Sequence, residues 1–389
     1  MSFTIENLPL YWRLSDYQDA KNTNNIVEAN LDFSFSWDAN NQLLIQKRND
    51  YLLEALNLIY KQEYNIGYLQ DANTLAENYG TDFFNFLIKT FDQYEIPSAS
   101  LLEIGCGGCV LLEKFKQKGF KVTGIDSSPF ATKSAKLKGI NVIEDFFPSE
   151  KIIGKFDVIF CVDVLEHIDF YEDFLTQQIN ILEPNGLVIV NVPDATESID
   201  KGDISLAMHQ HLNYFSINSL KNLFNRVGLR DVHVEKANYG GSLYAVGRGD
   251  KSNSSKNLSK NDFTNDKTLK RYSKKGKITL RNIRSHILET YRANKTIGFY
   301  VPLRALPYVC NLPSNVNFRF FDDTPHWHEK KFDGMDVLIE NMADLVSNPV
   351  DVIYIMSLTF GNEIRNKILT EFGDRIILFT LNDLIDGSK

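Results

Sequence analysis

The sequence predicts an α/β fold: a doubly wound, mostly parallel sheet, preceded by a mostly helical region and followed by a second, smaller α/β domain. Two observations predict this architecture. Short apolar runs typical of buried strands alternate with helical patterns across residues 98–250, and strand-like runs recur across residues 295–389. Residues 101–126 contain a strand, a glycine turn, a helix, a second strand and an acid, in the order of a nucleotide-binding half-unit.

The half-unit begins with an apolar run that ends in a glycine turn, Gly105-Cys106-Gly107-Gly108. Glycines can adopt positive φ, and they let the backbone approach a ligand at the start of the following helix. The second strand ends at Asp126, whose carboxylate can accept both hydroxyls of a ribose. Two cofactor classes fit, a dinucleotide and S-adenosylmethionine. The dinucleotide fingerprint requires a third glycine, and Val110 stands in its place.

The following segments extend the same pattern. Ser128 and Pro129 suit the start of a helix that Gly139 ends. We expect further strands over residues 140–143, 156–162 and 187–192, helices over 171–182 and 217–227, and a closing hairpin over 232–236 and 242–247. Residues 98–250 therefore form the cofactor-binding domain candidate.

Residues 1–97 are rich in aromatic side chains and contain two apolar helical faces, around Leu56 and around Leu87. We interpret this region as an accessory part that covers the cofactor and shapes a substrate pocket. Most of its aromatics belong to the core, and Tyr64 and Tyr68 are the candidates for substrate contact.

Composition narrows the function further. A net charge of −8 over 389 residues argues against nucleic acid as the main partner, because phosphate binding needs a basic face. No apolar stretch approaches the roughly 18–20 residues that span a bilayer, and the start lacks a signal-peptide pattern, so we expect no membrane partner. Four cysteines suggest a reducing compartment, and we expect a cytoplasmic protein. Cys106 and Cys109 have no second CxxC pair, so we expect no metal.

Five motifs in order, LLEIGCGGC, GIDSS, FDVIFCVDVLEHI, LEPNGLVIVNVP and HLNYFSINSLKNLFNRVG, resemble the class I S-adenosylmethionine-dependent methyltransferases. The resemblance implies a seven-stranded sheet with a terminal antiparallel hairpin and S-adenosylmethionine as the cofactor. The resemblance also implies that acidic residues at the strand ends hold the methionine part, the ribose, the adenine and the sulfonium of this cofactor. The cofactor residues that it implies are Glu103, Gly105, Cys106, Gly107, Asp126, Ser127, Asp145, Phe146, Asp163 and Val164.

A narrower resemblance concerns residues 209–216, HQHLNYFS, which are similar to the HEHLxYxS signature of deoxysugar C-methyltransferases. It implies that His209 or His211 acts as general base on a sugar or nucleotide-sugar, and His167 and Tyr214 are further substrate candidates. Gln210 stands where that family has an acid, and residues 1–97 lack the cysteines of its zinc module. O- or N-methylation, a general small-molecule acceptor and a non-catalytic partner therefore stay open, as does a homodimer.

Residues 251–294 form a basic linker and helix in this interpretation, and residues 295–389 form a small Rossmann-like domain. That domain resembles the C-terminal domain of sugar C-methyltransferases. Its first turn, Tyr300-Val301-Pro302-Leu303, lacks the glycines that a dinucleotide needs, so we expect it to bind no cofactor of its own.

Overall fold

The computed structural model describes residues 3–10, 14–16, 30–61, 74–96, 99–249 and 267–387. The chain divides into two compact units, each built from separate segments. The large-sheet unit comprises Trp37–Ala195 and Leu212–Asn265, and the small-sheet unit comprises Met1–Ser36, Thr196–His211 and Asp266–Lys389. These units interleave along the chain, whereas the sequence suggested four consecutive parts. The predicted boundaries stay a prediction.

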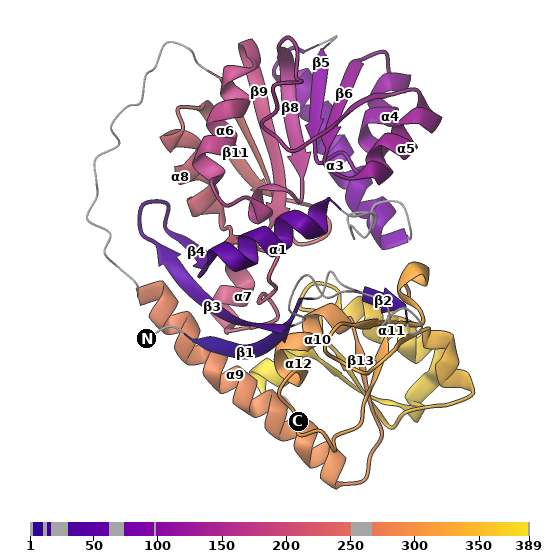
Figure 1. Ribbon diagram of the computed structural model, residues 1–389. Helices are drawn as coiled ribbons and strands as arrows, with labels where there is room; N and C mark the ends of the chain where they lie inside the picture. Colours follow the sequence, from indigo (N-terminus) through magenta and orange to yellow (C-terminus); the bar gives the residue numbers. More distant parts are fainter. Residues whose placement is uncertain are drawn as a thin grey trace. The chain divides into compact units, whose positions relative to one another are not determined.

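The large-sheet unit contains a seven-stranded sheet in the order β11-β12-β9-β8-β5-β6-β7 (Figure 1). Strands β9, β8, β5, β6 and β7 run parallel, and β12 lies antiparallel between β9 and β11. The seven strands and the terminal hairpin confirm the predicted sheet. The strands are β5 (Ser100–Ile104), β6 (Lys121–Asp126), β7 (Asn141–Glu144), β8 (Phe156–Val162), β9 (Leu182–Pro193), β11 (Arg230–Lys236) and β12 (Ser242–Arg248).

Helices cover both faces of this sheet (Figure 1). On one face the core contains residues of α6 (Tyr171–Asn180), α8 (Ile217–Arg226) and the 3-10 helix η3 (Leu165–His167). On the other face it contains residues of α3 (Thr74–Gln93), α4 (Val110–Gln117) and α5 (Pro129–Lys138). From residue 158 onward strand β8 is buried on both faces, which explains the apolar run over residues 158–162 that follows Asp157.

Local signals in the sequence set most of these boundaries. Ser128 caps α5 by accepting a hydrogen bond from the backbone N–H of Phe130, and Gly139 ends that helix in a left-handed conformation. Strand β9 starts at Leu182, earlier than the predicted residue 187, because residues 184–186 (Pro-Asn-Gly) form an irregularity within the strand, opposite residues 156–158 of β8.

The N-terminal region contains the two predicted helical segments, α1 (Asp50–Tyr60) and α3, but also strands that the sequence analysis did not predict. In the small-sheet unit β1 (Thr4–Pro9) pairs antiparallel with the first part of β3 (Asn30–Asp38). In the large-sheet unit β4 (Leu43–Gln46) pairs antiparallel with β10 (Asn213–Tyr214).

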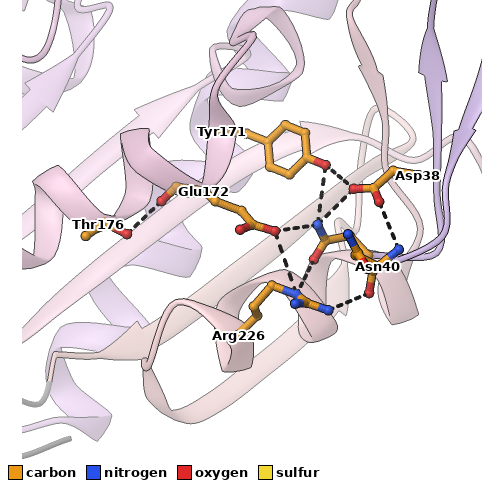
Figure 2. A network of polar contacts seen from close by, with 7 residues as sticks. Asp38, Asn40, Tyr171, Glu172, Thr176 and Arg226 are labelled. Atoms are coloured by element: carbon orange, nitrogen blue, oxygen red, sulfur yellow. Dashed lines mark hydrogen bonds and ion pairs between the residues drawn. The ribbon is translucent and has the colours of Figure 1, made fainter. Parts of the chain in front are cut away.

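A polar network joins the end of β3 and the turn after it to α6 and α8 (Figure 2). The Asn41 amide donates to Asp38 at 2.9 Å and to Glu172 at 2.7 Å, and Arg226 donates to Asn41 at 3.2 Å. Tyr171 also donates its hydroxyl to Asp38. Burial opposes ionisation of Asp38, but these hydrogen bonds outweigh it and lower the pKa of the carboxyl. These contacts therefore hold the turn against α6 and α8, which pack on one face of the large sheet.

The small-sheet unit contains a five-stranded parallel sheet in the order β16-β14-β13-β17-β18. This is the doubly wound order 3-2-1-4-5, so the domain is Rossmann-like in topology. The strand β16 was not predicted. The strands are β13 (Ile297–Tyr300), β14 (Arg319–Phe321), β16 (Ile339–Glu340), β17 (Val352–Ile355) and β18 (Ile377–Thr380), and β15 (Lys330–Phe332) pairs separately with β2 (Leu14–Asp16).

Several helices accompany this sheet and its N-terminal strands. The helix α11 buries Ile364 and Ile368 against one face of the sheet. His286 of α9 contacts Tyr354 of β17 at a ring distance of 5.6 Å. The helix predicted within residues 251–294 is α9, which begins at Lys267. The helices are α7 (Thr196–Lys201), α9 (Lys267–Arg292), α10 (Pro302–Val309), α11 (Gly361–Phe372) and α12 (Leu381–Asp386), beside short 3-10 turns η4 (Pro325–Trp327), η5 (Met342–Val346) and η6 (Gly373–Arg375).

A buried carboxylate fastens residues 196–211 within the small-sheet unit. Asp203 accepts hydrogen bonds from Ser198 at 2.9 Å, from the backbone and side chain of Ser205 at 2.7 Å each, and from the Tyr308 hydroxyl of α10 at 2.9 Å. Tyr272 of α9 donates to the carbonyl of Asp203 at 2.8 Å. Four donors compensate the burial of the charge, and they join this segment to α9 and α10.

Within the described residues, the helices are all too short or too polar to cross a membrane.

Candidate cofactor site at the carboxyl ends of the large sheet

The glycine turn after β5 packs directly on the residue that follows Asp163. Gly105 has φ +73°, and a Cβ atom placed on it would lie 2.5 Å from Cγ2 of Val164. Its N–H donates to the carbonyl of Ile125 in β6 at 2.8 Å. Only glycine satisfies both the backbone conformation and this contact. The structure thus brings together Gly105 and Val164, two of the predicted cofactor residues, at adjacent strand ends.

Asp126 ends β6 and ties the glycine turn to the start of α5. Its carboxylate accepts the N–H of Gly107 at 2.9 Å and the N–H of Ser128 at 2.8 Å. Burial raises the pKa of Asp126, and the two N–H bonds lower it in part. Each carboxylate oxygen accepts one N–H and keeps a second lone pair for a ribose hydroxyl.

The turn also has room for a ligand. An added Cβ on Gly107, at φ +45°, would have no heavy atom within 4 Å among the described residues. The buried Glu103 lies in register with Gly124 of β6 and Phe160 of β8, one residue before Ile104 at the end of β5. The residues present therefore fit a nucleoside cofactor, with an acid for the ribose and open backbone at the glycine turn.

The predicted adenine residues follow β7. Asp145 donates its N–H to the carbonyl of Asp126 at 3.1 Å, and its carboxylate accepts from Ser149 at 2.8 Å and lies 3.1 Å from Lys151. These contacts, that of Ser149 first, lower the pKa of Asp145. Phe146 lies beneath the ammonium of Lys61, at 5.6 Å from the ring centre. Both residues remain near the end of β7, at the same edge of the sheet as Asp126.

Ser127 has a different environment from the one expected of a cofactor ligand. Its hydroxyl donates to the carbonyl of Tyr60, the last residue of α1, at 3.1 Å.

Cys106 and Cys109 lie within the glycine turn with their sulfur atoms 3.9 Å apart, and both are reduced. The hydrogen bond with Cys109 and burial raise the pKa of Cys106 well above its usual range, so it is a poor nucleophile.

Asp163 follows β8 in a left-handed conformation, with φ +51°. The hydroxyl of Tyr79, from α3, donates to its carboxylate at 2.7 Å. Burial raises the pKa of Asp163 to about 6, and the Tyr79 hydrogen bond lowers it in part. Glu166, three residues on, is fully buried, and burial together with the charge of Asp163 raises its pKa well above its usual range. Of the two carboxyls, Asp163 is therefore the easier to ionise, because the Tyr79 hydroxyl donates to it.

Sequence reasoning missed three residues of this cluster. Tyr79 was counted only among the aromatics of the N-terminal region, and Asn191 of β9 and Ser242 of β12 were not singled out. Tyr79 lies 3.1 Å from Oδ1 of Asn191 and accepts from the Ser242 hydroxyl at 3.0 Å. No local motif marks these positions, because they meet only when α3 crosses the ends of β8, β9 and β12.

The predicted histidines belong to the small-sheet unit, whereas the predicted cofactor residues belong to the large-sheet unit. His209 is completely buried, its Nε2 lies 3.1 Å from the carbonyl oxygen of Leu8, and its ring packs on Phe33 at 5.5 Å. Burial lowers the pKa of His209 to about 4. His211 is partly buried and donates its N–H to the carbonyl of Met208 at 3.0 Å.

The other predicted substrate residues have separate positions. Tyr214 is buried in β10, opposite Leu44. His167 ends η3 and lies 3.8 Å from Glu166 and 6.0 Å, ring to ring, from Tyr60. Tyr64 and Tyr68 lie outside the described residues. A cavity of about 360 Å³ between α3 and β11, lined by Thr90, His233 and Glu235 among others, contains none of the predicted site residues.

Comparison with known proteins identifies the class. Residues 76–234 match the family model described as "Methyltransferase domain". This range includes the glycine turn, Asp126, Tyr79, Asp163 and Asn191, and it ends within β11, before Ser242. This similarity agrees with the resemblance to S-adenosylmethionine-dependent methyltransferases that the motifs indicated.

Two curated relatives show how far the likeness extends. One is the mitochondrial ubiquinone biosynthesis O-methyltransferase of Schizosaccharomyces pombe, 33% identical over 135 residues, which cover 32% of this chain and 49% of the relative. The other is the C-methyltransferase NovU of Streptomyces niveus, 31% identical over 150 residues, which cover 37% of this chain and 36% of the relative. The chain thus spans half or less of the length of these two relatives.

Among solved structures, the N-methyltransferase NodS of Bradyrhizobium japonicum, in complex with S-adenosylhomocysteine, is 17% identical with a TM-score of 0.38. The match covers 51% of this chain and 99% of NodS. The magnesium protoporphyrin IX methyltransferase of Synechocystis, with bound S-adenosylmethionine, is 12% identical with a TM-score of 0.37, and covers 52% of this chain and 99% of that protein. Identities this low say nothing of the acceptor.

Proposed function

We propose that the protein transfers a methyl group from S-adenosylmethionine to a small-molecule acceptor of the sugar or nucleotide-sugar class. One observation carries the methyltransferase part of this proposal. Three neighbouring strand ends meet within the large-sheet unit, where the Gly105 turn packs on Val164 and the Gly107 N–H is held by Asp126. This is the arrangement that a nucleoside cofactor needs at the carboxyl edge of a parallel sheet.

The cofactor and the chain would contribute different parts of the reaction. S-adenosylmethionine supplies an electrophilic methyl group when bound. The chain supplies orientation: Asp126 accepts the ribose hydroxyls, the glycine turn admits the ligand to the start of α4, and Asp163 provides a negative charge. Holding two reactants in a productive geometry can lower a barrier by roughly 7–11 kcal/mol.

An acceptor hydroxyl or an enolisable carbon must also lose a proton. We assign the general base to His211 rather than His209. The ring of His209 is buried, hydrogen-bonded to the carbonyl of Leu8, and too weak a base with a pKa of about 4. His211 is partly exposed and belongs to the same HQH run. A positioned histidine of this kind contributes about 10²–10⁴-fold to the rate.

The sugar assignment rests on the likeness of residues 209–216 to the deoxysugar C-methyltransferase signature and on the small Rossmann-like domain, and the similarity to the C-methyltransferase NovU supports transfer to carbon. We assign that domain a structural or acceptor-covering role, without a cofactor of its own. The similarity to ubiquinone biosynthesis O-methyltransferases favours a second candidate, O-methylation of a phenolic acceptor. A cytoplasmic location and a homodimer complete the proposal.

Titration calorimetry and a methyl-transfer screen test the proposal in two steps. The intact chain should bind S-adenosylhomocysteine and not NAD. Incubation with S-adenosylmethionine and a panel of nucleotide-sugars and catechols should then give a product heavier by one methylene in the nucleotide-sugar series. A product in the catechol series alone would replace the sugar assignment with the phenolic one. Binding of NAD alone would overturn the methyltransferase assignment.

A further inference from the structure

Tyr79 connects three strand ends of the large sheet through one hydroxyl. Its oxygen lies 2.7 Å from Oδ1 of Asp163 after β8, 3.1 Å from Oδ1 of Asn191 in β9, and 3.0 Å from Oγ of Ser242 in β12. The ring packs on Gly240, where an added Cβ would lie 2.4 Å from Cδ2 of Tyr79. Backbone and hydroxyl contacts together therefore fix the ring in one position.

A phenol has one hydrogen to donate, and two acceptors compete for it. Asp163 offers the shorter distance and a carboxylate, and hydrogen bonds to charged groups are the stronger ones. Ser242 donates to the phenol oxygen and leaves its hydrogen for an acceptor. Burial also keeps the phenol protonated, because it raises the pKa of Tyr79 well above its usual range. Tyr79 is therefore a permanent donor to Asp163.

The described part of the chain places no cation against Asp163. Among these residues, no lysine, arginine or histidine forms an ion pair with its carboxylate, although burial disfavours an isolated charge. The groups that interact with it include the Tyr79 hydroxyl, which donates to it, and the acid Glu166 and the thiol Cys161, whose pKa values its charge raises. Its left-handed backbone is tolerated by aspartate but is a costlier conformation than the extended one. A buried carboxylate that has no described cation beside it would be stabilised by a ligand that carries a positive charge.

We propose that Tyr79 is a positioning residue that holds the Asp163 carboxylate where it distinguishes the cationic substrate S-adenosylmethionine from the neutral product S-adenosylhomocysteine. This inference rests on the proposed function and adds a recognition role to it. The sulfonium and the thioether differ by one methyl group and one positive charge. A carboxylate fixed at the proposed cofactor site, beside the Val164 on which the glycine turn packs, therefore favours the substrate and releases the product. Without the phenol donor, Asp163 is left with weaker stabilisation of its charge and a freer side chain.

The test compares affinities for the two ligands in the intact chain, by titration calorimetry of S-adenosylmethionine and S-adenosylhomocysteine. Tyr79→Phe should weaken S-adenosylmethionine binding about tenfold, since one hydrogen bond to a charged group is lost, and should change S-adenosylhomocysteine binding less than about twofold. Asp163→Asn, which keeps the size and removes the charge, should shift the ratio of the two affinities in the same direction and further.

Tyr244→Phe is the matched control. Tyr244 also joins β12 to α3, but its hydroxyl donates to Asp82 at 2.9 Å and not to Asp163. Loss of this hydroxyl should leave the ratio of the two affinities unchanged. Equal loss of both ligands in Tyr79→Phe, or no change in either, would overturn the inference while leaving the methyltransferase assignment intact. Failure of the unaltered chain to bind either ligand would overturn the proposed function itself.

Discussion

Gly105→Ala probes the contact between the glycine turn and the end of β8. The substitution forces a side chain onto a residue at φ +73° and places its Cβ 2.5 Å from Cγ2 of Val164. The left-handed backbone costs about 1–2 kcal/mol for a residue with a Cβ. Relief of the overlap, by a shift of β8 or of the turn, costs about 1–3 kcal/mol more. We expect a total of about 2–5 kcal/mol, a large share of the roughly 5–15 kcal/mol typical of a folded domain.

Two further variants separate these contributions. Gly119 also has positive φ, at +89°, but an added Cβ meets no heavy atom of the described residues within 4 Å. Gly119→Ala should therefore show the backbone cost alone. The double variant Gly105→Ala, Val164→Ala removes the overlapping methyl and leaves the Val164 Cβ at 3.9 Å, an ordinary contact. It should be more stable than expected from the sum of the two single changes.

Urea unfolding followed by circular dichroism gives the free energies, and titration with S-adenosylhomocysteine gives the effect on the site. Gly105→Ala should lose both stability and affinity, and the double variant should recover part of each. Gly119→Ala should lose stability and keep its affinity. Equal losses in Gly105→Ala and Gly119→Ala, with additive behaviour of the double variant, would refute the claim that the turn packs tightly on Val164.

Four other predictions use different parts of the molecule. Asp126→Ala should weaken S-adenosylhomocysteine binding by at least about tenfold in calorimetry, because two hydrogen bonds from ribose to a charged group are lost; unchanged affinity would refute the ribose assignment. His211→Asn should spare cofactor binding and lower turnover about 10²–10⁴-fold, and unchanged turnover would remove His211 from the mechanism. Hydrogen bonds lower the pKa of Asp38 in the folded state below the unfolded-state value near 3.8, so its ionised carboxyl stabilises the fold above that value. This contribution is lost as the pH falls through the folded-state pKa. Asp38→Asn should therefore lower the free energy of unfolding at pH 7 and make that free energy decline less below about pH 4, as measured by unfolding at a series of pH values. Tyr308→Phe removes one of four donors to the buried Asp203 and should cost about 1–3 kcal/mol in urea unfolding, whereas a neutral result would mean that another donor replaces it.

The large sheet could be predicted because its signals are local. Buried parallel strands appear as apolar runs, as over residues 158–162 of β8, and caps such as Ser128 and Gly139 mark the ends of helices. The glycine turn and Asp126 follow their strands immediately, so their meeting at one edge of the sheet follows from the parallel topology.

What the sequence could not predict depends on contacts between distant segments. Strand β1 pairs with β3 more than 20 residues along the chain and β4 pairs with the distant β10, and β16 has only two residues. Tyr79 reaches Asp163 across 84 positions, and no pattern around Tyr79 indicates this. The assignment of residues 196–211 to the small-sheet unit depends on the burial of Asp203 against α9 and α10, which no local spacing reveals.

Titration calorimetry of the intact chain with S-adenosylhomocysteine, with NAD measured in parallel, tests the central claim most directly. The strand-end geometry of Gly105, Asp126 and Val164 predicts saturable, one-to-one binding of S-adenosylhomocysteine, with no heat of binding for NAD. Binding of NAD without S-adenosylhomocysteine would contradict the claim, since the glycine turn would then hold a dinucleotide despite Val110 in the place of the third glycine.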